Sequence, residues 1–160
     1  MPTKHVMPNE AAMRIALFQP EIAGNVGAVL RLGACFGVAV DLIEPMGFAW
    51  DDKRVRRAAM DYIDHVDIAR HPNFEAFRAA RPGARLVLMT TRGETSLYDA
   101  AFADSDILLF GQESAGVPAN IAAQCPLALR IPIRREVRSL NLATSAAIVL
   151  GEAVRQLSLR

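Results

Sequence analysis

Short apolar runs alternate along the chain with longer segments in which apolar residues recur every three or four positions. Apolar runs of about four to eight residues between turn residues are typical of buried strands, and the longer spacing is typical of helices. Strands are expected over residues 14–18, 38–43, 66–69, 85–90, 106–110 and 127–131. Helices are expected over 25–36, 51–60, 72–80 and 141–157, with a short helix beginning at Pro118 and a partly helical segment over 93–103.

The ends of the first helix carry recognisable signals. Asn25 is a residue type that caps helix N-termini, and Gly37 is of the type that ends helices. Asp51 and Asp52 similarly suit the positive end of the second helix, which we expect to run to about Met60.

The alternation of strands and helices predicts an α/β fold with a largely parallel sheet covered on both faces. Ligands in such sheets bind at the carboxyl ends of the strands, here the loops after Phe18, Met89, Phe110 and Ile131. One domain is expected over residues 13–160. Residues 1–12 are polar and contain two prolines, so we expect a disordered N-terminal extension.

The amino-acid composition excludes some classes of protein. Hydrophobic residues make up 52% of the chain, but charged residues or glycine interrupt every run before it reaches the roughly 18 residues of a membrane span. A soluble cytoplasmic protein is therefore expected, with no membrane partner. Cys35 and Cys125 stand apart, and His5, His65 and His71 lack metal-ligand spacing, so neither a disulfide framework nor a metal site is predicted.

Positive charge is concentrated although the net charge is only +1. Basic residues gather at 53–57 and again at 130–138, and such clusters are suited to contacts with phosphates. A solvated helix face would explain either cluster taken alone.

The first polar motif, Asn25 to Arg31, opens the first helix. Gly27 would let another backbone or a ligand come close, and Arg31 stands about two turns into the helix. The motif is neither a dinucleotide-binding glycine loop nor a P-loop, so nucleotide triphosphates are disfavoured. A surface arginine with an apolar stem would also explain Arg31.

The second motif, Phe110 to Pro118, contains Gly111, Glu113 and Gly116 at the end of a strand. The glycines permit tight backbone geometry, and exposed loop amides are suited to an uncharged or zwitterionic ligand. A serine hydrolase is disfavoured because Ser114 lacks the G-x-S-x-G surroundings and has no evident histidine partner.

The third motif joins 131–133 to 138–146, where a long helix begins. Helix capping alone would explain Ser139 or Asn141, and the small residues that follow allow close helix packing. Capping does not explain why all three motifs occur together.

Taken together, Asn25-x-Gly27-x-x-x-Arg31, 110–116, and 131–133 with 139–142 resemble the three motifs of SPOUT methyltransferases of the TrmH-like branch. Residues 44–54 are further similar to the minimal tRNA wobble-position ribose methyltransferases of the TrmL type. The resemblance covers about Met13 to Gln156.

This resemblance implies a parallel sheet whose C-terminal segment passes through a loop to form a trefoil knot. It implies a homodimer, with S-adenosylmethionine bound in the knot and the RNA site shared between subunits. The implied reaction is methylation of the ribose 2′-hydroxyl of nucleotide 34 in the tRNA anticodon loop.

Carried over residue by residue, the resemblance also assigns the site. The implied cofactor-binding residues are Met89, Thr90 with Thr91, Gly111, Gly116, Ile131, Ser139 and Leu140. The implied catalytic residues are Arg31, Asn25, Glu113, Ser139 and Asn141, and the basic residues expected to contact RNA are Arg54, Arg56, Arg57 and Arg138.

The reaction itself needs no metal, because a sulfonium methyl group is already electrophilic and the enzyme mainly has to align a nucleophile with it. Arg31 is the residue expected to activate the hydroxyl, by electrostatic stabilisation because arginine stays protonated. Three alternatives remain open: methylation of another tRNA or ribosomal RNA site, a non-catalytic RNA-binding or assembly module, and a small-molecule or nucleotide-binding enzyme.

Overall fold

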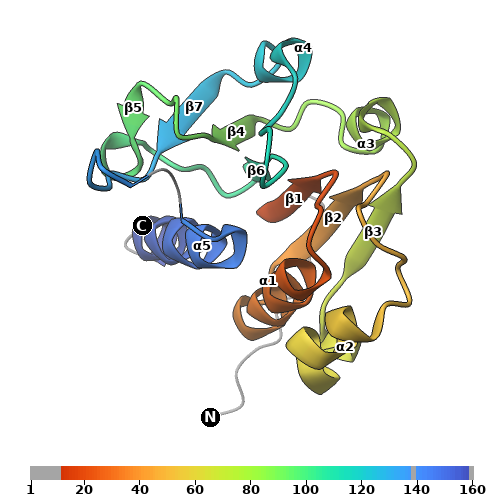
Figure 1. Ribbon diagram of the computed structural model, residues 1–160. Coiled ribbons are helices and arrows are strands. Elements are labelled where there is room, and N and C mark those ends of the chain that lie inside the picture. Colours follow the sequence, from red (N-terminus) through yellow and green to blue (C-terminus); the bar gives the residue numbers. More distant parts are fainter. Residues whose placement is uncertain (1–11, 138–139, 159–160) are drawn as a thin grey trace.

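A computed structural model describes residues 12–137 and 140–158 of the chain. Its strands form one sheet in the order β3-β2-β1-β6-β4-β7-β5, and every neighbouring pair is parallel (Figure 1). The strands are β1 (Arg14–Phe18), β2 (Ala39–Ile43), β3 (Ile68–His71), β4 (Leu86–Met89), β5 (Thr95–Ser96), β6 (Ile107–Phe110) and β7 (Leu127–Arg130). The predicted parallel α/β fold is confirmed.

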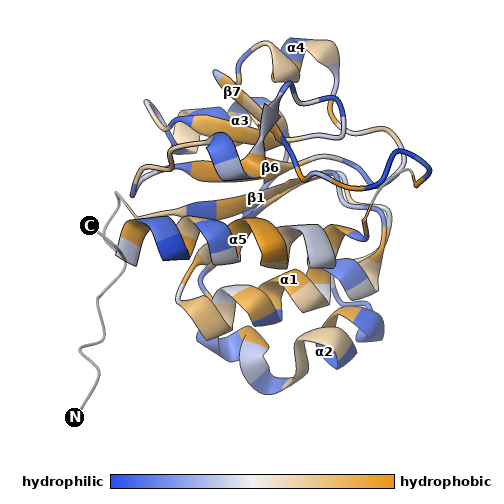
Figure 2. Ribbon diagram, turned by 90° about the vertical axis from the view of Figure 1, so that its left-hand side faces the viewer, coloured by the Kyte–Doolittle hydropathy of each residue, from blue (hydrophilic) through white to orange (hydrophobic). Residues whose placement is uncertain are grey.

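Helices cover both faces of this sheet, as the sequence pattern predicts. Figure 2 shows α5, α1 and α2 on one side of the strands, with α3 and α4 on the other. The helices are α1 (Ala23–Phe36), α2 (Lys53–Ala59), α3 (Phe74–Ala80), α4 (Ala119–Ala122) and α5 (Leu142–Ser158), and the 3₁₀ turns are η1 (Met60–His65) and η2 (Leu97–Asp99). None of the helices in the described part of the chain is long and apolar enough to cross a membrane.

Two apolar clusters, one on each face, hold the layers together. Successive side chains of a strand point to opposite faces, so Ile15 and Leu17 of β1 join the cluster beneath α1 and α5. Ala16 and Phe18 join the cluster on the other face. Because both faces of the sheet are buried, the central strands β4 and β6 are apolar throughout, which explains why they appear in the sequence as continuous apolar runs.

The structure corrects several predicted boundaries. Asn25 does not cap α1: the helix begins at Ala23, Ile22 is its N-cap residue, and Asn25 lies in the first turn. The other end is confirmed, since Gly37 adopts a left-handed conformation with φ of 67° and its amide donates to the carbonyl oxygen of Gly33. The third strand is displaced toward the C-terminus of its expected range, and Pro118 precedes α4 as its N-cap residue.

Candidate active site

A chain of hydrogen bonds joins one residue from each of the three motifs. The Asn141 side-chain nitrogen donates to the Asn25 side-chain oxygen at 2.9 Å. The Asn25 side-chain nitrogen in turn donates to Glu113 Oε1 at 3.4 Å. A carboxamide is the group that both accepts from one neighbour and donates to the other. Glu113, Asn25 and Asn141 are called the polar triad below.

Separate elements of the fold hold the two ends of the triad. Asn141 caps α5, because its side-chain oxygen accepts from the amides of Ala143 and Thr144 at 2.9 and 3.3 Å. The capping explanation for Asn141 is therefore correct, but its nitrogen remains available for Asn25. Glu113 Oε2 accepts from the backbone amide of Glu21 at 2.9 Å, which ties the loop after β6 to the loop after β1.

A reciprocal contact strengthens the link between these two loops. Glu21 Oε1 accepts from the backbone amide and the hydroxyl of Ser114 at 2.9 and 2.7 Å. The hydroxyl of Ser114 and its amide hold the pKa of Glu21 below the ordinary value. Ser114 thus has a structural partner in the loop after β1.

The loop after β6 is folded tightly upon itself. Gln112 and Gly116 exchange two backbone hydrogen bonds of 2.9 Å, and Gly116 has a φ of 65°. A Cβ atom on Gly111 would lie 2.4 Å from the carbonyl carbon of Gly116, so only glycine fits at position 111. The glycines of the second motif therefore shape a backbone loop that also positions Glu113.

The residues expected to bind the cofactor follow three neighbouring strands, β6, β4 and β7. Thr90, after β4, donates its amide to the carbonyl of Leu129 in β7 at 2.9 Å. Met89 and Ile131 are partly buried, while Leu140 is 36% exposed. Apolar side chains beside loop backbone groups fit an adenosine ligand held by main-chain hydrogen bonds. Ser139 lies outside the described residues, as does Arg138.

Among the described residues, no group of three or more acidic, histidine or cysteine side chains is arranged to hold a metal ion.

Arg31 lies apart from the polar triad within one chain. It follows Asn25 by six residues on α1, which corresponds to about 9 Å along the helix axis and roughly a third of a turn around it. Its exposed guanidinium lies 5.4 Å from the ring centroid of Tyr62 in η1. No carboxylate of the described residues is within ion-pair distance, so its N–H groups remain available to a substrate.

Gly27 serves helix packing and not ligand approach. A Cβ atom there would lie 2.3 Å from the carbonyl oxygen of Val55 and 2.7 Å from the Cβ of Ala58, both in α2. Helix α2 therefore lies directly against α1, and this contact fixes the basic cluster 53–57 relative to Arg31.

The predicted RNA-binding arginines of α2 differ in their surroundings. Arg54 is ion-paired with Asp52 at 2.6 Å, and this partner together with the amide of Arg54 lowers the pKa of Asp52 to about 2. Asp52 also caps α2. Arg56 and Arg57 are exposed and lack an acidic partner in the described part of the chain.

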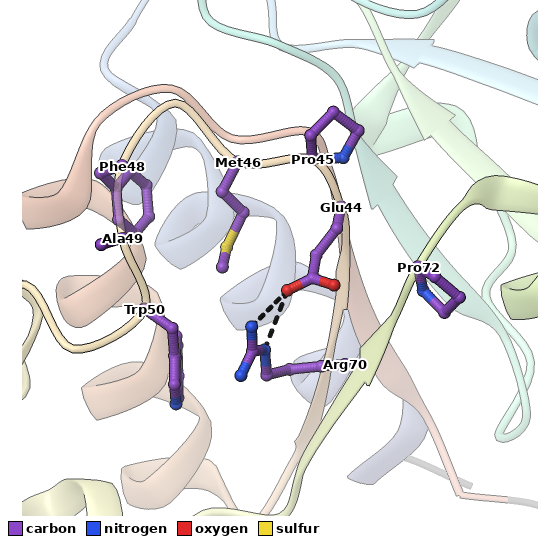
Figure 3. Close-up of a pocket in the computed structure, with 8 residues that line it drawn as sticks. All are labelled: Glu44, Pro45, Met46, Phe48, Ala49, Trp50, Arg70 and Pro72. Carbon is purple, nitrogen blue, oxygen red and sulfur yellow. Dashed lines mark hydrogen bonds and ion pairs between the residues drawn. The ribbon is translucent and has the colours of Figure 1, made fainter.

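An open hollow of about 460 Å³ lies at the carboxyl ends of β2 and β3, and motif analysis did not identify it as a site (Figure 3). Its walls come from the loop after β2 and from two residues around the end of β3. The lining residues are Glu44, Pro45, Met46, Phe48, Ala49, Trp50, Arg70 and Pro72. In the sequence, only the run 44–54 pointed to this region. That run is similar to known enzymes, but the similarity assigned no chemical role to its residues.

The parallel sheet and the polar triad at the carboxyl ends of its strands define an α/β protein with a site built from three segments that are distant in sequence. The chain belongs to the SpoU rRNA Methylase family, which matches residues 12–151.

Relatives and solved structures agree with this assignment. The chain is 50% identical over 144 residues, 89% of its length and 90% of the relative's, to a tRNA (cytidine(34)-2'-O)-methyltransferase of Beijerinckia indica. It is 43% identical to a structure described as giving insights into the 2-OH methylation of C/U34 on tRNA, with a TM-score of 0.89, covering 95% of this chain and all of that one. An AdoMet-bound rRNA methyltransferase from Sinorhizobium meliloti is 28% identical, with a TM-score of 0.83, covering 95% of this chain and 59% of that one.

Proposed function

We propose that this protein transfers the methyl group of S-adenosylmethionine to the ribose 2′-hydroxyl of nucleotide 34, the wobble cytidine or uridine, in the tRNA anticodon loop. The observation that carries this proposal is the polar triad, which brings residues from all three motifs into one hydrogen-bonded chain. Similarity to a tRNA (cytidine(34)-2'-O)-methyltransferase over almost the whole chain supports the substrate.

The cofactor is expected at the carboxyl ends of β4, β6 and β7. When bound, S-adenosylmethionine supplies an electrophilic methyl group. The residues that would enclose it are Met89, Thr90, Gly111, Gly116, Ile131, Ser139 and Leu140. The apolar side chains of Met89, Ile131 and Leu140 would exclude water from the adenosine, and the tight loop 111–116 would offer backbone groups in fixed positions.

Arg31 would act on the ribose hydroxyl. It has N–H groups without a carboxylate partner among the described residues, and Tyr62 restrains its guanidinium. Because an arginine remains protonated, it would orient the hydroxyl and stabilise the negative charge that develops on the oxygen. Its position away from the triad of its own chain supports a site that two subunits share.

We further propose that the chain forms a homodimer and that residues 131–141 belong to a trefoil knot. The triad would position the start of α5 and the loop after β6, and thereby the knot loops. Ser139, expected to take part, lies outside the described residues. The domain would span residues 13–160, with 1–12 as an extension, and an enzyme acting on tRNA would work in the cytoplasm.

Basic side chains would hold the RNA backbone around the target nucleotide. Arg56 and Arg57 are exposed beside α1, and Arg54 and Arg138 would extend the same contact. Unpaired bases of RNA loops are accessible to protein side chains, which fits an anticodon loop.

Incubation of the protein with methyl-labelled S-adenosylmethionine and total tRNA, followed by mass spectrometric mapping of the methylated ribose, tests the proposal. Label at the 2′-oxygen of nucleotide 34 is expected. Label at another tRNA position, or in ribosomal RNA supplied in parallel, would mean that the proposed reaction is correct but that the substrate is a different RNA site. Calorimetry that detects no S-adenosylmethionine binding would favour a non-catalytic module, and transfer to free nucleosides would favour a small-molecule enzyme.

A further inference from the structure

We infer that the hollow at the ends of β2 and β3 binds one unpaired base of the substrate RNA, next to the nucleotide that is methylated. The base would stack against the Trp50 and Arg70 pair, and the carboxylate of Glu44 would accept a hydrogen bond from its amino group. This inference rests on the proposed function, because it assumes an RNA substrate with an unpaired loop.

The hollow combines flat and apolar surfaces. The guanidinium of Arg70 lies 5.2 Å from the ring centroid of Trp50. Figure 3 shows the tryptophan ring edge-on beside that guanidinium, with Met46 and Phe48 above the pair in this view. RNA-binding proteins recognise unpaired bases by stacking them on aromatic rings or on arginine guanidinium planes.

Glu44 provides the polar group of the hollow. Its Oε1 atom accepts from both Nε and Nη2 of Arg70, at 3.1 Å from Nε. Its Oε2 atom has no hydrogen-bond partner among the described residues, and its side chain is 27% exposed. A carboxylate oxygen accepts from the exocyclic amino groups of cytosine, adenine or guanine, whereas uracil offers only its ring N3–H group. The hollow is therefore expected to favour a base that carries an amino group.

The hollow is connected to the active site through one short loop. Gly47 donates its amide to the carbonyl of Pro20 at 2.9 Å, and a Cβ atom on Gly47 would lie 2.8 Å from the carbonyl oxygen of Glu21. The amide of that same Glu21 donates to Glu113 of the polar triad. A nucleotide in the hollow would thus lie near the loops that the polar triad positions.

The positive charge near the hollow is also suited to the phosphates of a bound nucleotide. Trp50 is followed within three residues by the first residue of α2, where Lys53, Arg56 and Arg57 are exposed. These cations would lie beside the phosphates of a base held in the hollow. The volume of about 460 Å³ falls within the roughly 300–1,000 Å³ of ligand sites and would accommodate a single base with its sugar.

The test uses the full-length protein and anticodon stem-loop RNAs in which each unpaired loop nucleotide except nucleotide 34 is replaced in turn by an abasic one. With the natural protein, one abasic position is expected to weaken binding by roughly fivefold to a hundredfold, the usual range for a lost base stack. In Trp50→Leu the same replacement should cause no further loss. Equal effects of every abasic position in both proteins would overturn the inference.

Glu44→Gln keeps the size of the side chain; its single amide oxygen would remain with Arg70, so the group that faces the base would be an NH2 that cannot accept a hydrogen bond. It should remove the preference for an amino-bearing base over uracil at the identified position, and Glu75→Gln, an exposed residue of α3, should not. Tyr98→Leu serves as the control for Trp50→Leu, since Tyr98 is 57% exposed at η2. Melting temperatures identify any variant that fails to fold.

Trp50 is the only tryptophan of the chain, so its fluorescence reports directly on the hollow. Quenching on RNA binding is expected, and it should be weaker with the RNA whose abasic position weakens binding.

Steady-state kinetics separate this inference from the proposed function. A raised KM for RNA with little change in kcat is expected of the hollow variants; unchanged KM in active variants contradicts the inference alone. An absence of methyl transfer by the natural protein contradicts the proposed function.

Discussion

The side chain of Asn141 donates a hydrogen bond to the side chain of Asn25 across 2.9 Å, although the two residues are 116 positions apart in the chain. The bond connects the first residue before α5 to the first turn of α1, and these two helices pack against each other. Because Asn25 also donates to Glu113, a change at either asparagine should be transmitted to the loop after β6.

Asn141→Ser should separate capping from catalysis. Serine caps a helix nearly as well as asparagine, but its short hydroxyl cannot reach Asn25. We expect a change of less than about 1 kcal/mol in stability and a fall in methyl transfer of up to about tenfold, as for one lost hydrogen bond. Asn73→Ser is the matched control, because Asn73 caps α3 in the same way without contacting the triad. Equal activities for both variants would argue against a role of the triad in positioning.

Arg31→Ala should reduce methyl transfer at saturating cofactor by about a hundredfold or more, the typical loss on removing one group that stabilises a developing oxyanion. Arg31→Lys keeps the charge but loses the planar fork of donors, so a smaller loss is expected. Single-turnover rates measure both effects. Arg155→Ala is the control, since Arg155 is an exposed residue of α5 paired with Glu152. Near-normal turnover in both Arg31 variants would exclude the role.

Gly27→Ala should destabilise the fold by about 1–3 kcal/mol, because the added methyl group would overlap the backbone of α2. Gly24→Ala in the same helix meets nothing within 4 Å and should be neutral or slightly stabilising. Urea unfolding of the two variants measures the difference. Equal midpoints would show that α1 and α2 are not in close contact.

Because of Asp41, the free energy of unfolding should depend on pH in the acidic range. This fully buried carboxylate accepts hydrogen bonds from Arg14, His71 and Arg81 at 2.7, 2.8 and 3.0 Å. Burial raises the pKa of Asp41, but the three hydrogen bonds and the charge of Arg14 outweigh burial and hold the pKa below 3.8. The contribution to stability is therefore present above about pH 4, the range of the unfolded chain, and is lost as the pH falls through the lower folded pKa.

Asp41→Asn tests this assignment. At pH 7 the variant should be less stable by about 3–5 kcal/mol, because it leaves two partly buried arginines and the buried His71 without their carboxylate. The difference from the natural protein should narrow as the pH is lowered below about 4. Asp104→Asn, at an exposed position, should show neither effect in the same denaturant titrations. A gap that stays constant with pH would mean that Asp41 does not titrate as proposed.

Arg57→Gln should weaken tRNA binding at all sequences alike and reduce the slope of log affinity against log salt by about 1. Arg54→Gln should have a smaller effect, because Asp52 already neutralises Arg54 in the free protein. Binding measured over a series of salt concentrations compares the two. A larger loss of affinity in Arg54→Gln than in Arg57→Gln would indicate that RNA displaces Asp52 from Arg54.

Local sequence patterns predict most of the elements and the parallel α/β class of the sheet, but they miss strand β5 in the segment 93–103, which is expected to be partly helical. Residues 15–18 of β1 and 107–110 of β6 are buried, so each appears as an unbroken apolar run that a local sequence pattern reveals. Gly37 likewise signals the end of α1 because the required left-handed backbone is a local property. The three motifs could also be recognised, because each is defined by residue types at fixed spacing along the chain.

Only the tertiary structure decided what the motif residues contact. Asn25 looks like a helix cap in sequence, but its hydrogen-bond partners lie 88 and 116 positions away, and no local pattern encodes such pairs. Gly27 indicates close approach of a backbone or a ligand, and only the folded structure shows that the backbone of α2 approaches it. The hollow beside Trp50 needs Arg70 from the following strand, and only parallel pairing of β2 with β3 brings the two residues together. Local propensity acts over a few residues, whereas a site is made by whichever chain segments the sheet places side by side.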